Sequence, residues 1–163
     1  MGPILRYNLI LFLTCFLPFC ASAQDSFEPD HSVSLEEFKE KALQAKEEIW
    51  VVDFWASWCR PCIMSMPELK GVQKRFQGKA VRFFSISWDD NAEMWDMAVR
   101  RMQMVWPQII IPDPRKGDPF IDGEFPHKSI PSIFIVTREG KVKRVKGVEN
   151  LERTLKKQLA KAG

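Results

Sequence analysis

Hydrophobic residues recur along the chain with two periods, one typical of amphipathic helices and the other of buried strands. Ser34 opens a capping box, and the apolar positions behind it recur every three or four residues, which predicts a helix ending near Glu47. The run Ile49–Trp55 is apolar except for Asp53 and rich in β-branched and aromatic residues. This composition is typical of a strand buried on both faces of a sheet.

The helical period returns at Cys59 and continues to Phe76, with Pro67 inside it as a predicted kink. A second buried strand is predicted over Val81–Trp88, and Asp90 can cap a further helix behind it. The apolar stripe of that helix consists of Met94, Met97, Ala98, Met102 and Val105. No Cys or His joins the stripe, so we expect core packing there rather than copper binding.

Turn-forming residues dominate the next region of the chain. Trp106–Lys128 is rich in proline, glycine and aspartate, which predicts an irregular connection with room for one short strand. Two strands over Ile133–Val136 and Lys141–Val145 then flank a turn in which Gly140 is expected to adopt a positive φ. These two strands should form an antiparallel hairpin.

A last amphipathic helix is predicted to begin at Glu149 or Asn150. The predicted order of elements is therefore αβαβα, a loop and ββα. Strands that are separated by helices pair in parallel, whereas the final hairpin is antiparallel and lies at an edge. The fold class is α/β, with a mixed central sheet and helices on both faces.

The first 23 residues have the order of features found in secretory signal peptides. Arg6 supplies a positive charge, Leu9–Phe19 is apolar, and Ala21–Ala23 is a small-x-small cleavage signal. The apolar run is shorter than the roughly 20 residues that a spanning helix needs. We therefore expect export to the periplasm or another extracytoplasmic space, although an uncleaved signal would leave the protein tethered to the membrane.

The rest of the chain is expected to form one domain. The full chain has 163 residues, of which 45% are hydrophobic, and this suits a single globular core. Residues 24–32 are polar and form a predicted flexible lead-in, so residues 33–163 are assigned to the domain. The formal net charge of +3 and the lack of a nucleic-acid motif argue against a nucleic-acid partner.

Removal of residues 1–23 leaves two cysteines, Cys59 and Cys62, in the sequence WCRPC. A stabilising staple is a poor explanation, because closing so short a loop removes little entropy from the unfolded chain. A zinc site needs about four ligands, and the mature chain adds only His31 and His127, which lack metal-ligand spacing and are expected at the surface. A redox pair is the interpretation that needs no further ligand.

A redox dithiol needs one thiol that ionises near neutral pH and a second thiol that resolves the mixed disulfide. Cys59 lies where a strand leads into a helix, so the helix N-terminus should stabilise its thiolate. Cys62 follows one turn later and should be more buried. Arg60 adds a cation, and Pro61 restrains the first helical turn without losing a needed N–H group.

Two further residues near the pair invite a functional interpretation. Asp53 lies within an apolar strand, where burial should raise its pKa and let it carry the proton of Cys62. The alternative for Asp53 is an outward-facing residue on an edge strand. Trp55 and Trp58 could pack in the core or at its rim, or form an apolar platform beside the exposed sulfur of Cys59.

These features together resemble the thioredoxin family, and most closely its exported TlpA/ResA-type branch. The resemblance rests on VVDFWASWCRPC, which ends at Cys62, on Pro67, on SIPSIFIV around Pro131, and on the REGKV hairpin. It covers the chain from about residue 33 to the C-terminus.

The resemblance implies a thioredoxin fold with a cis bond between Ile130 and Pro131 and an insertion, within residues 88–128, before the cis-proline strand. It also implies that Cys59 is the nucleophile and Cys62 the resolving cysteine, with Asp53 as the buried carboxylate. Substrate would bind at three residues near the pair: Trp58, Ile130 and Pro131.

The function implied is that of a thiol:disulfide oxidoreductase, expected to act as a reductase without a metal or organic cofactor. Its implied partners are disulfide-containing client proteins and a membrane electron donor. Arg60 stands where the family commonly has glycine, and its cation favours the thiolate and hence the reduced pair. Two alternatives stay open: a peroxiredoxin-like peroxidase, for which Ser57 is the one nearby hydroxyl, and a non-catalytic metal or haem-maturation chaperone.

Overall fold

The computed structural model describes residues 28–31, 33–44, 46–111 and 117–162. The predicted signal peptide, residues 1–23, lies outside the described residues. Within the described ranges, no helix combines the length and the apolar character needed to cross a membrane.

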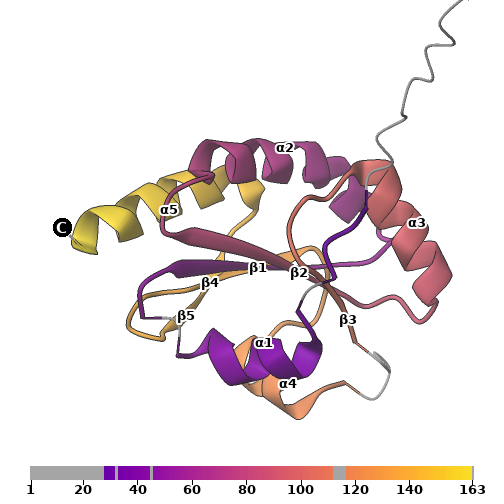
Figure 1. Ribbon diagram of the computed structural model, residues 1–163, viewed down its shortest axis with the longest axis horizontal. Coiled ribbons are helices and arrows are strands. Elements are labelled where there is room, and N and C mark those ends of the chain that lie inside the picture. Colours follow the sequence, from indigo (N-terminus) through magenta and orange to yellow (C-terminus); the bar gives the residue numbers. More distant parts are fainter. Residues whose placement is uncertain (1–27, 32, 45, 112–116, 163) are drawn as a thin grey trace, which may run out of the picture.

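Five strands form one central sheet, as Figure 1 shows. They are β1 (Ile49–Trp55), β2 (Val81–Ser87), β3 (Gln108–Ile110), β4 (Ser132–Val136) and β5 (Val142–Val145), in the spatial order β3-β2-β1-β4-β5. β1 pairs in parallel with β2, and β2 with β3, whereas β4 is antiparallel to both β1 and β5. The predicted mixed sheet and its antiparallel hairpin are therefore confirmed.

Helices cover both faces of the sheet, as predicted. They are α1 (Leu35–Ala42), α2 (Arg60–Phe76), α3 (Ala92–Met102), α4 (Pro119–Glu124) and α5 (Leu151–Leu159), with short 3-10 turns η1 (Val148–Asn150) and η2 (Ala160–Ala162). Figure 1 shows α2 and α5 on one face of the sheet and α1 and α4 on the other, with α3 beside the N-terminal end of α2. The domain thus has three layers around a central strand, β1.

Every residue of β1 is buried, because the strand lies between β2 and β4 and is covered on both faces. Side chains alternate along a strand. Val51 and Trp55 accordingly pack with the core of α2, α3 and α5, whereas Val52 and Phe54 pack with the core under α1 and α4. The side chain of any β1 residue can therefore be assigned to one of the two cores.

One helix is shorter than predicted, and another was not predicted. The Ser34 cap is confirmed, since its Oγ accepts from the N–H of Glu37 at 3.1 Å, but α1 ends at Ala42 instead of near Glu47. The apolar period stops at that point, and the charged residues that follow have no core to pack against. The connection after β3 contains α4, a short helix that was not predicted and that Asp118 caps.

The apolar face of α3 is also not the predicted one. Met94, Met97 and Val105 are 54%, 58% and 56% exposed, whereas Trp95 and Val99 make the buried contacts of this region. Trp95 offers more apolar area than either methionine, so the helix is rotated to bury it. The prediction that the methionine stripe is core packing is wrong for its exposed members. The cap is Asn91 instead of the predicted Asp90, through a bond from the N–H of Met94 at 2.9 Å.

Candidate redox site

The two cysteines lie where the carboxyl end of β1 leads into α2. Cys59 is the N-cap of α2, in extended conformation, and is joined to Cys62 by a disulfide. The N–H of Cys62 donates to Sγ of Cys59 at 3.2 Å. This N–H group, which has no partner within the helix, and the positive end of the helix dipole both stabilise negative charge on that sulfur. The predicted placement of Cys59 at a helix N-terminus is confirmed.

Exposure separates the two cysteines less than predicted. Cys59 is 5% exposed and Cys62 is 2% exposed, so the expectation of a solvent-facing Cys59 is wrong for the bonded pair. In the disulfide each sulfur covers the other, and both pack in the core that contains Trp55. Trp55 is fully buried and therefore packs in the core. Trp58, which precedes Cys59 in the chain, is 63% exposed and can form the predicted apolar platform.

The residues between the cysteines are both on the surface. Arg60 is the first residue of α2, and Pro61 lies in the first turn, where a helix leaves N–H groups without intrahelical partners. This confirms the predicted position of Pro61. Pro67 lies inside α2, as the sequence predicted, and it is exposed.

Asp53 lies in the middle of the central strand and is 4% exposed. Because β1 has neighbours on both sides, the alternative of an edge position is wrong. Burial raises the pKa of Asp53 from its ordinary value of 3.8 to about 7, and a hydrogen bond from Ser85 opposes that rise. Alternation along β1 places Asp53 on the same side as Val51 and Trp55, which is the side of α2 and the cysteines.

Ser85 of β2 connects Asp53 to a buried tryptophan. Its hydroxyl donates to Oδ2 of Asp53 at 3.3 Å and accepts from Nε1 of Trp106 at 2.9 Å. The indole N–H can only donate, so it fixes the serine proton on the Asp53 side. Ser85 and Trp106 were not predicted as site residues. The register partner of Asp53 on β2 is Ser85, and a buried serine next to a buried carboxylate was the available signal.

A second buried aspartate, Asp89, was also missed. It is 2% exposed, and its carboxylate accepts from the N–H of Ser57 at 2.9 Å, from the Ser57 hydroxyl at 2.6 Å and from the Ser87 hydroxyl at 2.6 Å. Ser57 is two residues before Cys59, so these hydrogen bonds to Asp89 fix the position of the loop that leads to the cysteine pair. The signal was topological: the carboxyl ends of two parallel strands meet at one edge of a sheet, and Asp89 follows β2 as Ser57 follows β1.

The peptide bond between Ile130 and Pro131 is cis, as the family resemblance implied. Ile130 packs against the core that contains both cysteines, and Pro131 is exposed just before β4. Pro131 also lines a hollow of about 430 Å³ with Ser65 of α2 and the segment that joins β5 to η1. The cis-proline thus lies on the β4–β5 side of α2.

His127, expected at the surface, is half-buried. Its ring lies 4.1 Å from that of Phe54 and 4.9 Å from that of Trp88, between centroids. Burial lowers its pKa, against a hydrogen bond to the carbonyl of Phe125. Aromatic neighbours from β1 and the loop after β2 explain why the surface prediction for His127 is wrong, whereas His31 is 42% exposed.

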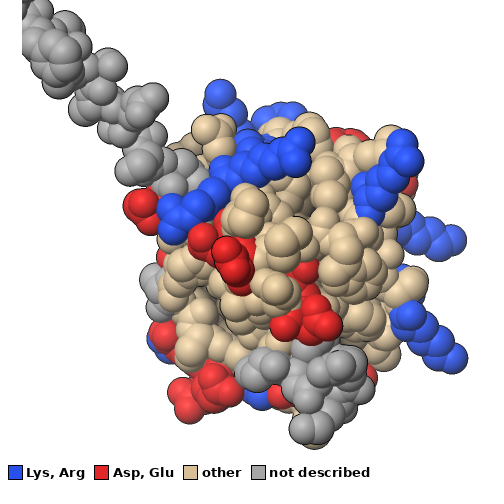
Figure 2. Space-filling model, turned by 90° about the vertical axis from the view of Figure 1, so that its right-hand side faces the viewer, with Lys and Arg blue, Asp and Glu red and all other residues tan. Residues whose placement is uncertain are grey.

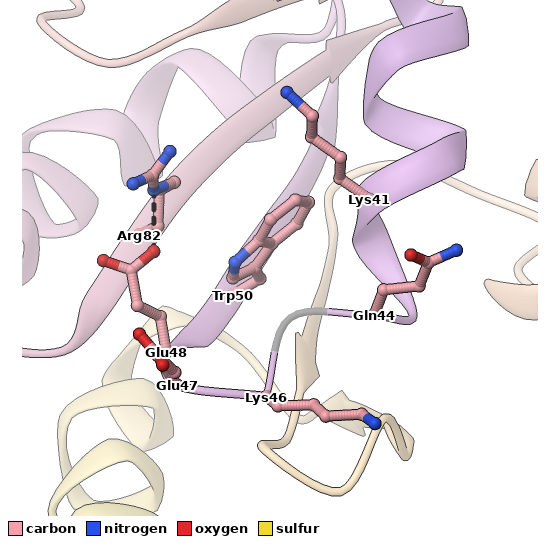
Figure 3. A pocket seen from close by; sticks show the side chains of 7 residues that line it. All are labelled: Lys41, Gln44, Lys46, Glu47, Glu48, Trp50 and Arg82. Carbon is pink, nitrogen blue, oxygen red and sulfur yellow. Dashed lines mark ion pairs between the residues drawn. The ribbon is translucent and has the colours of Figure 1, made fainter.

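A hollow of about 490 Å³ lies at the opposite end of β1 and contains none of the predicted site residues. Figure 3 shows Trp50 at its centre, Lys46 pointing away from it, and Arg82 paired with Glu48 at 2.9 Å. Two of its cations are paired, Arg82 with Glu48 and Lys41 with Glu37, and β1 separates the hollow from the cysteines. Across the described residues, no three His, Cys, Asp or Glu side chains are grouped so that they could hold a metal ion.

Comparison with known proteins gives one family model and several relatives. The thioredoxin model matches residues 30–124, which include both cysteines and Asp53. The thiol-disulfide oxidoreductase ResA of Bacillus thuringiensis subsp. konkukian is 28% identical over 131 residues, which are 77% of this chain and 68% of that protein. The thioredoxin-like protein YneN of Bacillus subtilis is 29% identical over 126 residues, covering 72% and 67% of the two chains.

Among solved structures, the thioredoxin domain of a thiol-disulfide oxidoreductase from Bacteroides vulgatus superposes with a TM-score of 0.61 at 25% sequence identity. The match covers 70% of this chain and 81% of that one.

Proposed function

The chain belongs to the thioredoxin family of thiol:disulfide oxidoreductases, and from that premise we propose that it acts outside the cytoplasm as a reductase of disulfides in client proteins. The observation that supports this most is the cysteine pair at the start of α2, on the same side of the sheet as a buried carboxylate with a pKa of about 7. The predicted signal peptide supports the location.

In the first step the thiolate of Cys59 attacks one sulfur of the client disulfide. A bond forms between Cys59 and that sulfur, the client S–S bond breaks, and the other client sulfur leaves as a thiolate that takes a proton from water. The N–H of Cys62, 3.2 Å from Sγ of Cys59 in the oxidised pair, is placed to stabilise the attacking anion.

In the second step Cys62 resolves the mixed disulfide. Its thiol gives its proton to the carboxylate of Asp53, and the resulting thiolate attacks Sγ of Cys59. The Cys59–client bond breaks, and the second client sulfur leaves as a thiolate that takes a proton from water, so the client departs as a dithiol while the protein holds the Cys59–Cys62 disulfide. Two electrons have passed from the pair to the client, and a membrane electron donor would return two.

The direction of electron flow depends on which charges act on the thiolates. Arg60 favours the thiolate and hence the reduced pair, but it is exposed and its field is weakened by water. An ionised Asp53 disfavours a nearby thiolate and acts from a buried position, where charges interact more strongly. The effect of Asp53 on the thiolates should therefore outweigh that of Arg60 and make the reduced pair less stable, which supports a reductase.

The peroxidase alternative has less support. It needs a free hydroxyl near the nucleophile to polarise the peroxide, and the Ser57 hydroxyl is donated to Asp89 at 2.6 Å.

The experiment that tests the proposed direction is the reduction potential of the Cys59–Cys62 pair, measured by equilibration with a dithiol buffer of known potential. A reductase should lie near the thioredoxin value of about −270 mV. A value near about −120 mV, typical of a strong oxidant, would show that the chain donates disulfides instead. Export is tested separately by the mass of the secreted chain, which should begin at Gln24.

A further inference from the structure

Exposed apolar side chains are concentrated at the cysteine end of the molecule. Among the described residues six large hydrophobic side chains are exposed, and five of them lie just before α2, in its first turns or on α3. These five are Trp58, Ile63, Met64, Met94 and Met97. Soluble monomeric proteins rarely expose contiguous apolar patches without a binding role.

Two adjoining hollows, of about 630 and about 390 Å³, lie between α2 and α3 and share Ile63 and Met102 in their walls. We call the combined depression the methionine groove and define it by Ile63, Met94, Met97 and Met102. Figure 2 views the end of the molecule where α3 lies and shows an uncharged area that Asp and Glu interrupt and that Lys and Arg border on several sides.

We propose that the methionine groove binds an extended, apolar segment of the client polypeptide next to the client's reactive cysteine. This inference rests on the proposed function. The groove is continuous with the redox site, because Ser57 in its wall and Ile63 flank the two cysteines in the chain. A client sulfur positioned at Cys59 brings the neighbouring client residues over the first turn of α2, and the groove opens there.

The lining of the groove suits clients of different sequence. Methionine side chains are unbranched and flexible and adapt to varied apolar shapes, and surfaces rich in them bind many partners. A specific pocket for one ligand would be expected to have branched or aromatic walls and a few fixed polar groups. The groove therefore fits a polypeptide class better than a single small molecule.

The charges at the rim indicate a preference for acidic clients. Arg100 and Arg101 line the groove, and the side chain of Lys70 reaches the carbonyl of Met102 at 2.7 Å across it. Arg100 already pairs with two carboxylates of the chain itself, Asp96 at 2.7 Å and Glu28 at 3.0 Å, so Arg101 and Lys70 carry the preference for acidic clients. Cationic side chains at the same rim would repel a metal cation bound by the thioethers.

The test uses two peptide dimers, each linked by one disulfide between identical cysteine peptides. In one peptide Leu, Phe and Glu follow the cysteine; in the other Ser and Gly replace them at equal length. The reduced protein is mixed with each dimer, and its oxidation is followed by tryptophan fluorescence in stopped flow. Oxidised glutathione serves as a disulfide too small to reach the groove.

The apolar, acidic dimer should oxidise the protein about tenfold faster than the Ser/Gly dimer. The double variant Met94→Gln, Met97→Gln should lose that preference and keep its rate with oxidised glutathione. Val105→Gln is the matched control, because Val105 is 56% exposed and does not line the groove. Both variants change exposed residues, so the fold should be preserved.

Equal rates with the two dimers in the wild type, or an equal loss in the Val105→Gln control, would overturn the groove as a client site. A change in oligomeric state of the double variant in sedimentation would also overturn it, because the groove would then join copies of this chain. No oxidation by any of the three disulfides would instead contradict the proposed function itself.

Discussion

Two aspartates lie buried at the cysteine end of the sheet, and they differ in how many donors they meet. Asp89 is 2% exposed and accepts three hydrogen bonds of 2.6 to 2.9 Å. Asp53 is 4% exposed and accepts a longer side-chain hydrogen bond, from Ser85 at 3.3 Å. The two aspartates are similarly buried but have different roles. Asp89, with three hydrogen bonds, fixes the position of the chain, whereas Asp53, with fewer donors, can take up a proton.

The largest effect should come from removing the well-bonded carboxylate. Asp89→Ala leaves the N–H of Ser57 and the hydroxyls of Ser57 and Ser87 without their acceptor, and should lower the free energy of unfolding by about 3 to 5 kcal/mol. Urea unfolding measures this. Asp90→Ala is the matched control, since Asp90 is exposed and its loss should change stability by less than about 0.5 kcal/mol.

The loop before Cys59 should also lose its fixed position, so turnover of Asp89→Ala should fall even under conditions where the variant is fully folded. Equal stability of the Asp89 and Asp90 variants would show that the three hydrogen bonds contribute nothing, and the contrast between the two buried carboxylates would disappear.

A smaller effect, confined to catalysis, is expected from Asp53→Asn. The amide keeps the shape of the side chain but cannot accept the proton of Cys62, so disulfide reduction at pH 7 should slow about a hundredfold. Alkylation of Cys59 should proceed as in the wild type. An unchanged reduction rate between pH 6 and 9 would show that Asp53 is only structural.

The same variant should change how stability depends on pH. The pKa of Asp53 is raised to about 7 in the folded protein, so between about pH 4 and 7 the folded state holds a proton that the unfolded state has lost. Wild-type stability should therefore fall as pH rises through this range, and the Asp53→Asn variant should lack that part of the fall. Thermal unfolding across the range measures it.

The smallest effect is expected from Ser85→Ala. The hydrogen bond from Ser85 lowers the pKa of Asp53, so its loss should move the midpoint of the pH–rate profile upward by about half a unit to one unit. Ser85→Thr keeps a hydroxyl and should leave the midpoint near that of the wild type. A midpoint that does not move in Ser85→Ala would remove Ser85 from the proton step.

The parts of the fold that the sequence predicted are those with a local signal. β1 is recognisable because an unbroken apolar run is long enough for a strand, and Cys59 because the run ends where a helical period starts. Gly140 was placed by its turn, and its φ is 73°. The cis bond before Pro131 came from the family resemblance alone.

The features that the sequence missed depend on contacts between distant segments. Asp89 and Ser57 are 32 residues apart, and only the parallel pairing of β1 with β2 brings them together. α4 is too short for a periodic pattern and contains Gly123. On α3 two apolar stripes, one with Met94 and one with Trp95, lie one residue apart, and packing against the core selects between them.

The most direct test of the assigned redox chemistry is covalent trapping of client proteins by single cysteine variants. Cys62→Ala leaves the nucleophile at the start of α2 without a resolving thiol, so mixed disulfides through Cys59 should accumulate on non-reducing gels. Cys59→Ala should trap nothing and be inactive. Equal trapping by both variants, or trapping through Cys62 alone, would contradict the roles assigned to the two sulfurs.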